Sequence, residues 1–522
     1  MASPISFALF QQNINFYHIK KNMENINRKW TDGMLRTEDW WAVWLGLIMF
    51  FAGLFTIWGI DLVGWMTKVK TWEWTNLMSD FSWAKLLKPS TETYTRLHPL
   101  ASLFFTYIIF TSVTCVGAYF QKLNVKKFFL GFTIIFFITW LCWIVGHEAH
   151  FKSVDAIVKG KNYFEKYNLS WGLQLGGGFS YMLALAIGLI IGNFFKNLAK
   201  FLKESAKPEW FIKTAIVYLG IKLGLMSMQA TGFAIDLALT GAAAVFVAYL
   251  LFWPIIYYMS RRFFKLGRDA AAVLSSGISI CGVSAAIATA GAIRAKPILP
   301  IALSMLIVIF AMLELIVLPS FYAAVAPNEP IVNGAAMGMT VKTDGADAAA
   351  GAILDELMVS QHLKATGEQW QEDWILAAAI LTKIWIDVFI GVWAFILALI
   401  WMYKVEKRSV ESNVPLSEIW FRFPKFVIGY FITWFFYLLI IILAPDVKDA
   451  ASVGANVVQS PMRKMMFMLT FVSIGVITDF SKLKGMGKLA VLYAIGLFVV
   501  IAPIAYGVAY IFHHGMVPPL VK

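Results

Sequence analysis

The sequence has few charged residues for its length. Only 14% of the 522 residues are charged, while 59% are hydrophobic and 16% are aromatic. Ordinary soluble domains carry about 25% charged residues. The deficit of charge excludes an ordinary soluble protein and indicates a protein that lies in a membrane.

Catalytic and metal-binding motifs are also scarce. In the stretch GHEAH, His147 and His150 lie three positions apart, whereas a zinc-binding helix needs a spacing of four. The cysteines Cys115, Cys142 and Cys281 all lie in apolar segments, which suits packing better than disulfides or a reactive thiol. The sequence therefore predicts no enzyme, no bound metal and no cofactor.

Long apolar runs are what the sequence has in abundance. Examples are residues 42–60, 128–145, 375–403 and 489–512. Each approaches or exceeds the roughly 20 residues that a helix needs to cross hydrocarbon. No stretch shows the alternating pattern of a membrane β-barrel. We expect an all-α polytopic membrane protein with about 13 transmembrane segments.

The net charge of +13 is spread over short loops and does not form one basic stripe. This distribution argues against nucleic-acid binding and fits the excess of positive charge in cytoplasmic loops. It places the N-terminus inside, and it places the C-terminus and the acidic segment from Asp355 to Asp373 outside. The basic loops contain Lys196, Lys200, Lys203 and Lys207; Arg261, Arg262, Lys265 and Arg268; Lys404, Lys407 and Arg408; and Lys482, Lys484 and Lys488.

Composition divides the chain into three parts. Residues 1–40 lack the apolar run and cleavage site of a signal peptide, and they are expected to be a cytoplasmic N-terminal arm. Residues 41–168 are strongly aromatic and nearly free of buried polar groups, so we interpret them as an accessory transmembrane region. Residues 169–522 are richer in glycine, alanine and polar side chains, and they form the expected core with inverted repeats.

Residues 274–293, LSSGISICGVSAAIATAGAI, are long enough to span a bilayer but are rich in serine and glycine. Such residues cluster in spanning segments where helices pack closely or where a helix breaks beside a cavity. Gly277 and Gly282 flank Ser279 and Cys281. The cluster predicts a break at mid-span, with a small-residue packing face as the alternative.

Residues 333–354, NGAAMGMTVKTDGADAAAGAIL, form a second glycine-interrupted segment that includes Lys342, Asp344 and Asp347. Ionisable residues at membrane depth are costly and face a partner or a water-filled path. Two such segments are typical of a secondary transporter, in which half-helix ends meet at the substrate site. Two alternatives would give these charges no role in transport. Lys342 and Asp347 could simply neutralise each other, or the segment could lie outside the membrane and carry surface charges.

The two segments supply the candidate site. Helix N-termini, hydroxyl groups and a lysine are the donors that an anion needs where water is absent. Asp344 and Asp347 are expected to take a coupling ion, either a proton or sodium. Lys383 and Asp387 lie four residues apart and would either pair on one helix face or line the path. The expected substrate-binding residues are Ser276, Ser279, Cys281, Gly282, Ser284, Thr340, Lys342 and Thr343.

Five segments, taken in order, resemble the YeiH-like sulfate exporter family. They are SSGISICGVSAAIATAGAI, GAAMGMTVKTDGADAAAGAI, AAILTKIWIDV, EIWFRFPKFVIGYF and SIGVITDF, and the similarity runs from about residue 172 to residue 512. The resemblance implies a transporter of the cation/proton antiporter and anion transporter superfamily, with inverted repeats and two discontinuous helices that cross at mid-membrane. Lys342 stands where the family pattern has His or Asp, which favours an anionic substrate.

Together these features predict a secondary active transporter of a small anion, such as sulfate, sulfite or a sulfonate. It would work by alternating access and be coupled to protons or sodium. The alternatives are an anion channel and an ion-coupled carrier of organic anions on the same scaffold. We expect a multi-pass protein of the bacterial inner membrane that contacts lipid and no nucleic acid. The superfamily resemblance and the aromatic N-terminal helices also favour a homodimer.

Overall fold

The structure is a computed structural model of the chain. It describes residues 31, 33–74, 84–88, 93–153, 157–158, 161–173, 179–227, 231–293, 295, 298–401, 405, 424–483 and 487–521. Most of the expected arm at residues 1–40 and the basic residues Lys404, Lys407 and Arg408 lie outside the described residues. The chain separates into the units Met1–Met34 and Leu35–Lys522, and every element below belongs to the second unit.

The first part of this unit combines long helices with two short hairpins. Capping side chains mark where the long helices begin, because Thr37 accepts a hydrogen bond from the Trp40 backbone N–H and Asn124 accepts one from Lys127. The elements are α3 (Glu38–Leu54), η1 (Phe55–Trp58), β1 (Ala84–Lys88), β2 (Thr93–Leu97), α5 (Pro99–Phe120), α6 (Val125–Gly146), α7 (Ala149–Lys152), β3 (Ile157–Val158), β4 (Lys161–Asn162) and α8 (Tyr163–Lys166). Strands β1 and β2 pair antiparallel, as do β3 and β4.

The rest of the described chain is mainly helical and includes two 3-10 turns, η5 (Pro445–Val447) and η7 (Phe480–Leu483), beside the α-helices. They are α9 (Phe179–Phe194), α10 (Lys196–Leu202), α11 (Pro208–Ser227), α12 (Thr231–Arg262), α13 (Arg268–Ser279), α14 (Val283–Ala292), α15 (Ile298–Val325), α16 (Pro330–Thr340), α17 (Asp344–Thr366), α18 (Trp374–Ile400), α20 (Phe426–Leu443), α21 (Lys448–Val457), α22 (Arg463–Ile477), α23 (Gly487–Ala494) and α24 (Ala502–His513). Short π-helical turns, Val458–Met462 and Ile495–Ile501, join α21 to α22 and α23 to α24.

Seven helical segments in the described residues are long and apolar enough to cross a membrane, or eight if a bent pair counts as one span. The bent pair is α9 and α10, which meet at 114°. The all-α polytopic class is confirmed. The predicted count of about 13 spans is not confirmed, because short helices such as α13, α14 and α16 do not reach across a bilayer alone.

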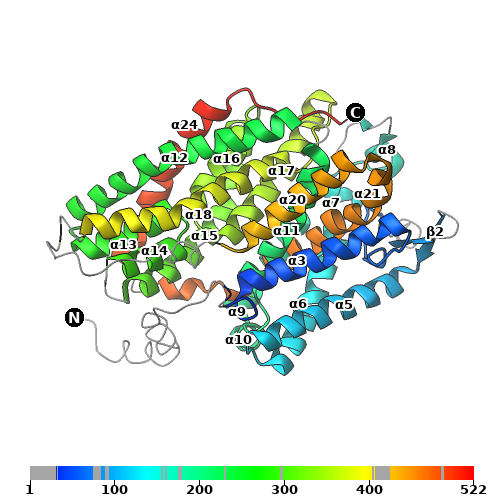
Figure 1. The fold of residues 1–522 in the computed structure, drawn as a ribbon, viewed down its shortest axis with the longest axis horizontal. Coiled ribbons are helices and arrows are strands. Elements are labelled where there is room, and N and C mark those ends of the chain that lie inside the picture. Colours follow the sequence, from blue (N-terminus) through cyan, green and yellow to red (C-terminus); the bar gives the residue numbers. More distant parts are fainter. Residues whose placement is uncertain are drawn as a thin grey trace. The chain divides into compact units, whose positions relative to one another are not determined.

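The helices pack in two groups (Figure 1). In the first, which we call the α11 group, α11 packs against α3, α20 and α22, and α22 packs against α9 and α6. In the second, the α18 group, α18 packs against α16, α17, α14 and α12, while α24 packs against α16 and α12. The groups meet where α11 contacts α17.

Glycine allows the closest helix contacts in the α11 group. A Cβ atom on Gly188 of α9 would lie 2.4 Å from the carbonyl oxygen of Val472 in α22. A Cβ atom on Gly475 would lie 2.5 Å from the carbonyl carbon of Gly188. The backbones of α9 and α22 therefore touch, which is the kind of contact that small residues permit between membrane helices.

The α18 group uses the same device. A Cβ atom on Gly334 or Gly338 of α16 would lie 2.4 or 2.3 Å from the carbonyl oxygens of Ile375 and Ala379 in α18. The backbones of α16 and α18 are therefore in direct contact over one helical turn.

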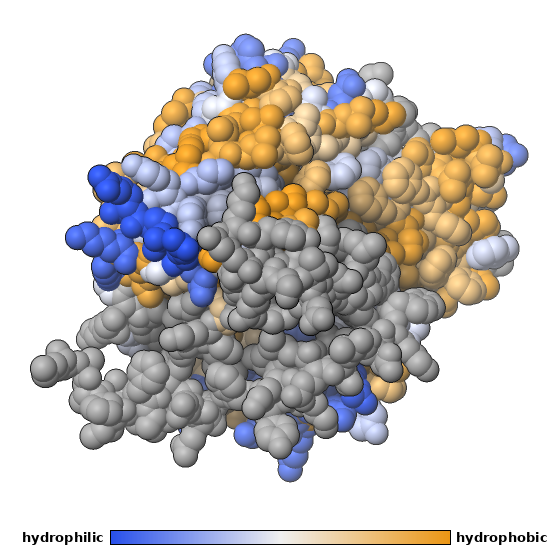
Figure 2. Space-filling view, turned by 60° about the vertical axis from the view of Figure 1, so that its left-hand side comes forward, coloured by the Kyte–Doolittle hydropathy of each residue, from blue (hydrophilic) through white to orange (hydrophobic). Residues whose placement is uncertain are grey.

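Large apolar side chains lie on the outside of the described helices. Phe104 of α5 is 58% exposed, Leu239 of α12 is 63% exposed and Ile511 of α24 is 76% exposed. Figure 2 shows broad hydrophobic areas on one face, with hydrophilic residues gathered toward its edges. Exposed apolar patches of this extent fit contact with lipid.

Candidate functional site

The first predicted break is present between α13 and α14. Ile280, Cys281 and Gly282 separate the two helices. Gly282 has φ of +72°, a left-handed conformation that glycine adopts at little cost. The packing alternative also holds for this segment, because a Cβ atom on Gly277 would lie 2.3 Å from the side chain of Leu303 in α15. The small residues therefore serve both a break and a close helix contact.

The second predicted break separates α16 from α17. α16 ends at Thr340, and Val341 is extended with φ of −71° and ψ of 129°. Thr343 caps α17 because its side chain accepts a hydrogen bond from the Ala346 N–H at 3.2 Å. Two of the expected site residues, Lys342 and Thr343, therefore lie in the break itself.

The two breaks touch each other. A Cβ atom on Gly282 would lie 2.7 Å from the carbonyl oxygen of Lys342. We call this contact of residues 280–282 with residues 341–343 the crossing. Two discontinuous helices are thus present, and α14 and α17 both begin at the crossing. The N-terminal ends of helices carry unpaired N–H groups and partial positive charge, which attract anions.

Lys342 is fully buried at the crossing. Its Nζ donates to the carbonyl oxygen of Met339 at 2.6 Å, and its backbone N–H donates to Oε2 of Glu314 at 3.0 Å. Glu314 belongs to α15 and is also fully buried. The alternative pair between Lys342 and Asp347 does not form a hydrogen bond, because Lys342 bonds to its own helix instead.

Carboxylates and a second lysine surround the crossing. Asp347 is 1% exposed, and its carboxylate has no hydrogen-bond partner within the described residues. Asp387 is 3% exposed, and its carboxyl group interacts with that of Asp344. Lys383 is 3% exposed, and its Nζ donates to the carbonyl oxygen of Val341 at 3.0 Å. Its charge acts on Asp344, Asp347 and Asp387. The alternative ion pair of Lys383 with Asp387 is therefore not hydrogen-bonded, and Lys383 reaches the break instead.

The hydroxyl groups of the expected site differ in their hydrogen bonding. Ser276 accepts hydrogen bonds from Trp253 Nε1 at 2.9 Å and from Thr289 Oγ1 at 2.7 Å. Thr340 donates to the carbonyl oxygen of Ala336 at 2.7 Å. The buried Ser279 hydroxyl has no hydrogen-bond partner among the described residues. The side chain of Ser284 lies outside the described residues.

Glu314, in the apolar run AMLELIVL, is not among the expected site residues. The signal was available, since an acidic residue at the middle of an apolar helix is costly unless it is paired. The residue that Glu314 contacts could not be predicted, because Lys342 lies outside α15, in the break between α16 and α17. The crossing therefore holds the ammonium groups of Lys342 and Lys383 and four carboxylates, those of Glu314, Asp344, Asp347 and Asp387.

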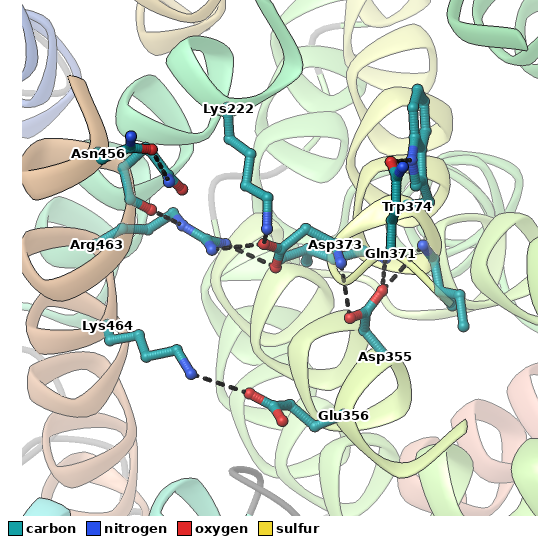
Figure 3. A network of polar contacts seen from close by, with 12 residues as sticks. Lys222, Asp355, Glu356, Gln371, Asp373, Trp374, Asn456, Arg463 and Lys464 are labelled. Carbon is teal, nitrogen blue, oxygen red and sulfur yellow. Dashed lines mark hydrogen bonds and ion pairs between the residues drawn. The ribbon is translucent and has the colours of Figure 1, made fainter. Parts of the chain in front are cut away.

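A second buried cluster of charges joins the two helix groups (Figure 3). Arg463 of α22 donates from Nη1 to Oδ1 of Asp373 at 3.0 Å and from Nη2 to Oδ2 at 2.7 Å. Lys222 of α11 also donates to Oδ2 of Asp373. Close by, Lys464 of α22 pairs with Glu356 of α17 at 3.2 Å. We call these residues the Asp373 cluster.

Asp355 fixes the start of α18 within the same view (Figure 3). Its Oδ2 accepts a hydrogen bond from the backbone N–H of Asp373 at 2.8 Å. Its Oδ1 accepts from Ile375 at 3.0 Å and from Leu376 at 3.3 Å. Asp355 belongs to α17, so one helix caps the N-terminus of the next. Asp355 and Glu356 are therefore helical residues, and the acidic loop begins later than the sequence suggested.

Asp373 lies just before the candidate span that begins at Trp374. Burial alone would raise its pKa, but the charges of Arg463 and Lys222 and their hydrogen bonds hold the pKa of Asp373 well below its usual range. Asp373 is thus an anion that neutralises two cations from the α11 group. Lys222 lies within an apolar run, and nothing in its sequence context indicates Asp373 as its partner.

The fold and the crossing define a multi-pass helical membrane protein with two discontinuous helices that meet at their breaks. The chain belongs to the UPF0324 membrane protein family, and it matches the family model described as Conserved hypothetical protein 698 over residues 174–494.

The relatives span several bacterial groups. A UPF0324 membrane protein of Nitrosomonas europaea is 61% identical over 498 residues, which cover 95% of this chain and 100% of the relative. One from Rhodopirellula baltica is 31% identical over 79% of this chain and 68% of the relative. One from Nitratidesulfovibrio vulgaris is 32% identical over 73% of this chain, and the match spans 59% of that relative. No solved structure matches the chain.

Proposed function

We propose that the protein is a secondary active transporter of a small anion, such as sulfate, sulfite or a sulfonate, that works by alternating access in the bacterial inner membrane. The observation that carries this proposal is the contact between Gly282 and the carbonyl oxygen of Lys342. It brings the starts of α14 and α17 together beside two buried lysines. Discontinuous helices whose N-terminal ends point at an anionic substrate are a recurring transporter site.

The charges favour coupling to a cation. Four carboxylates outnumber the two ammonium groups of Lys342 and Lys383 at the crossing, and the Asp347 carboxylate has no hydrogen-bond donor among the described residues. An unpaired charge at membrane depth is costly. A proton or a sodium ion on these carboxylates would remove the excess negative charge and let an anion bind beside Lys342. We therefore propose Asp344 and Asp347 as coupling-ion residues, with Asp387 and Lys383 lining the path.

The substrate-binding proposal is refined by the hydrogen bonds. Ser279 has an unused hydroxyl at the break, so it is the hydroxyl donor that we favour for the substrate. Ser276 is engaged by Trp253 and Thr289, and its role is to join α13 to α12 and α14. The homodimer and the accessory role of residues 41–168 stay predictions.

The test is thermal stabilisation of the purified protein by sulfate, sulfite and a sulfonate, and separately by an organic carboxylate, with and without sodium and over a range of pH. A ligand that binds only the folded state raises stability by RT ln(1 + [L]/Kd), which is about 2.7 kcal/mol at a hundredfold excess over Kd. The variants are Lys342→Ala and Lys342→Met, which keeps most of the side-chain length. Lys364→Ala, on the exposed side of α17, is the matched control.

We expect one of these anions to stabilise the wild type and the Lys364→Ala control but neither Lys342 variant. Dependence on sodium or on pH would then identify the coupling ion. Stabilisation that survives both Lys342 substitutions would refute the site. Stabilisation that ignores both sodium and pH would favour the channel, and stabilisation only by organic carboxylates would favour the organic anion carrier.

A further inference from the structure

Asp39 falls within the predicted arm of residues 1–40, but it belongs to α3 and links this helix to the core. It lies in the first turn of α3, whereas the family match covers residues 174–494. Its Oδ1 accepts a hydrogen bond from Nζ of Lys213 in α11 at 2.7 Å, and the two side chains are 28% and 13% exposed. The other carboxylate oxygen of Asp39 accepts from the backbone N–H of Lys425, the N-cap of α20, at 3.3 Å. One residue of α3 therefore contacts two core helices.

Lys213 continues this contact toward the crossing. Its Nζ lies 3.4 Å from Oε2 of Glu209, one turn earlier on α11. Oε1 of Glu209 would lie 3.0 Å from a Cβ atom on Gly345, in the first turn of α17. The chain Asp39, Lys213, Glu209 thus ends where α17 starts.

The charge of Lys213 reaches the carboxylates of the crossing. It interacts electrostatically with Asp344, which begins α17, and with Asp387 of α18. Lys213 is therefore the third cation of the site, after Lys342 and Lys383. Unlike those two, it is held by an acidic residue from outside the core.

We propose that Asp39 is a positioning residue for the core site: it anchors Lys213 beside the first turn of α17, and so the accessory helix sets the charge that a solute meets at the crossing. This inference rests on the proposed transport function. A partly buried ammonium group settles beside the nearest carboxylate. In the wild type the Lys213 ammonium group interacts with the carboxylates of both Asp39 and Glu209. Without the charge of Asp39, it would interact with Glu209 and the start of α17 only.

The test uses Cys281, which lies in the break of α13 and α14, as a natural reporter. Cys115 and Cys142 are replaced by alanine, and the purified protein is treated with an anionic and a cationic methanethiosulfonate reagent of similar size. The ratio of the two modification rates at Cys281, followed by mass spectrometry, reports the local charge. General loosening of the fold raises both rates together and leaves their ratio unchanged.

The variants shift the charge in opposite directions. Lys213→Gln removes the cation and should lower the anionic-to-cationic ratio, by about threefold at partly screened distances. Asp39→Asn leaves Lys213 uncompensated and should raise the ratio by a similar factor. The matched control is Asp479→Asn, because Asp479 pairs with Lys196 at 2.8 Å, outside this chain of contacts. The control should leave the ratio unchanged.

The exchange Asp39→Lys with Lys213→Asp distinguishes a residue that sets the charge at the crossing from one that only holds α3 against α11. It restores an ion pair between α3 and α11 but reverses the charge beside α17, so we expect recovered thermal stability with a ratio below that of the wild type. A ratio that returns to the wild-type value would overturn the proposal. So would an unchanged ratio in Asp39→Asn, or a Cys281 that reacts with neither reagent, since no solute would then meet this charge. This experiment uses the charged reagents and not the transported anion. Its result therefore does not depend on whether anion binding is found in the Lys342 test.

Discussion

Gly282 determines whether the two broken helices can meet. The residue needs a left-handed backbone and also lies against the carbonyl oxygen of Lys342. Any other residue type would meet both obstacles, because a Cβ atom disfavours positive φ and occupies the contact. The serine and glycine content of residues 274–293 was enough to predict this break. The contact with Lys342 was not predictable, because it joins positions 60 residues apart by number.

Gly282→Ala should destabilise the protein more than an alanine at another left-handed glycine. The strained backbone costs about 1–2 kcal/mol, and overpacking against Lys342 adds about 1–3 kcal/mol. Gly367→Ala is the control, because Gly367 has φ of +76° but no atom within 4 Å of a Cβ placed there. Thermal unfolding in detergent measures both variants. Equal losses of stability in the two would show that the crossing is not tightly packed.

At the scale of elements, the apolar runs predicted helices well but not how many of them cross the membrane. The runs at residues 42–60 and 128–145 match α3 with η1 and α6, since uninterrupted apolar sequence favours one straight helix. The number of spans is hard to predict where polar sequence divides a segment into two short helices, as at α13 with α14 and α16 with α17. Hydropathy reflects the free energy of transferring a segment from water to the membrane. A short helix that crosses only half of the membrane needs fewer apolar residues, so its hydropathy signal is weaker.

The contact of α9 with α22 supplies a prediction at this scale. Gly188→Ala should destabilise the protein by about 1–3 kcal/mol, because its Cβ atom would lie 2.4 Å from the carbonyl oxygen of Val472 and would push the helices apart. Gly507→Ala in α24 meets no atom within 4 Å and should be neutral or stabilising by up to about 1 kcal/mol. Thermal unfolding of both variants checks this, and a Gly188→Ala protein as stable as the wild type would contradict the backbone contact.

Considering the whole unit, the Asp373 cluster holds the α11 group and the α18 group together. Lys222 and Arg463 come from the first group, and Asp373 precedes the first turn of α18 in the second. Such long-range pairs escaped sequence reasoning, because each charged residue alone looked like an ordinary end of an apolar run. Only the fold shows that the two cations share one anion.

Removing that anion should be costly. Asp373→Asn leaves two buried cations without a full partner, and we expect a loss of about 3–5 kcal/mol. The pKa of Asp373 is lowered on folding, so its contribution is complete above the unfolded value near 3.9 and is lost as the pH falls through the folded value. The stability difference between wild type and variant should therefore be constant from about pH 5 to pH 8 and shrink only below about pH 4.

A matched control is Asp479→Asn, because Asp479 pairs with Lys196 at 2.8 Å where both side chains are more exposed. That change should cost about 0–1 kcal/mol. Unfolding measured over this pH range decides between the two cases. A difference for Asp373→Asn that already fades between pH 8 and pH 5 would mean that Asp373 is not held as an anion by these cations.

Asp355 has one more consequence. Its hydrogen bonds join the middle of α17 to the first turn of α18, while Gly334 and Gly338 bring the backbone of α16 against α18. We infer that α16, α17 and α18 move as one rigid body. Asp347, Lys383 and Asp387 would then keep a constant spacing in any motion of this body.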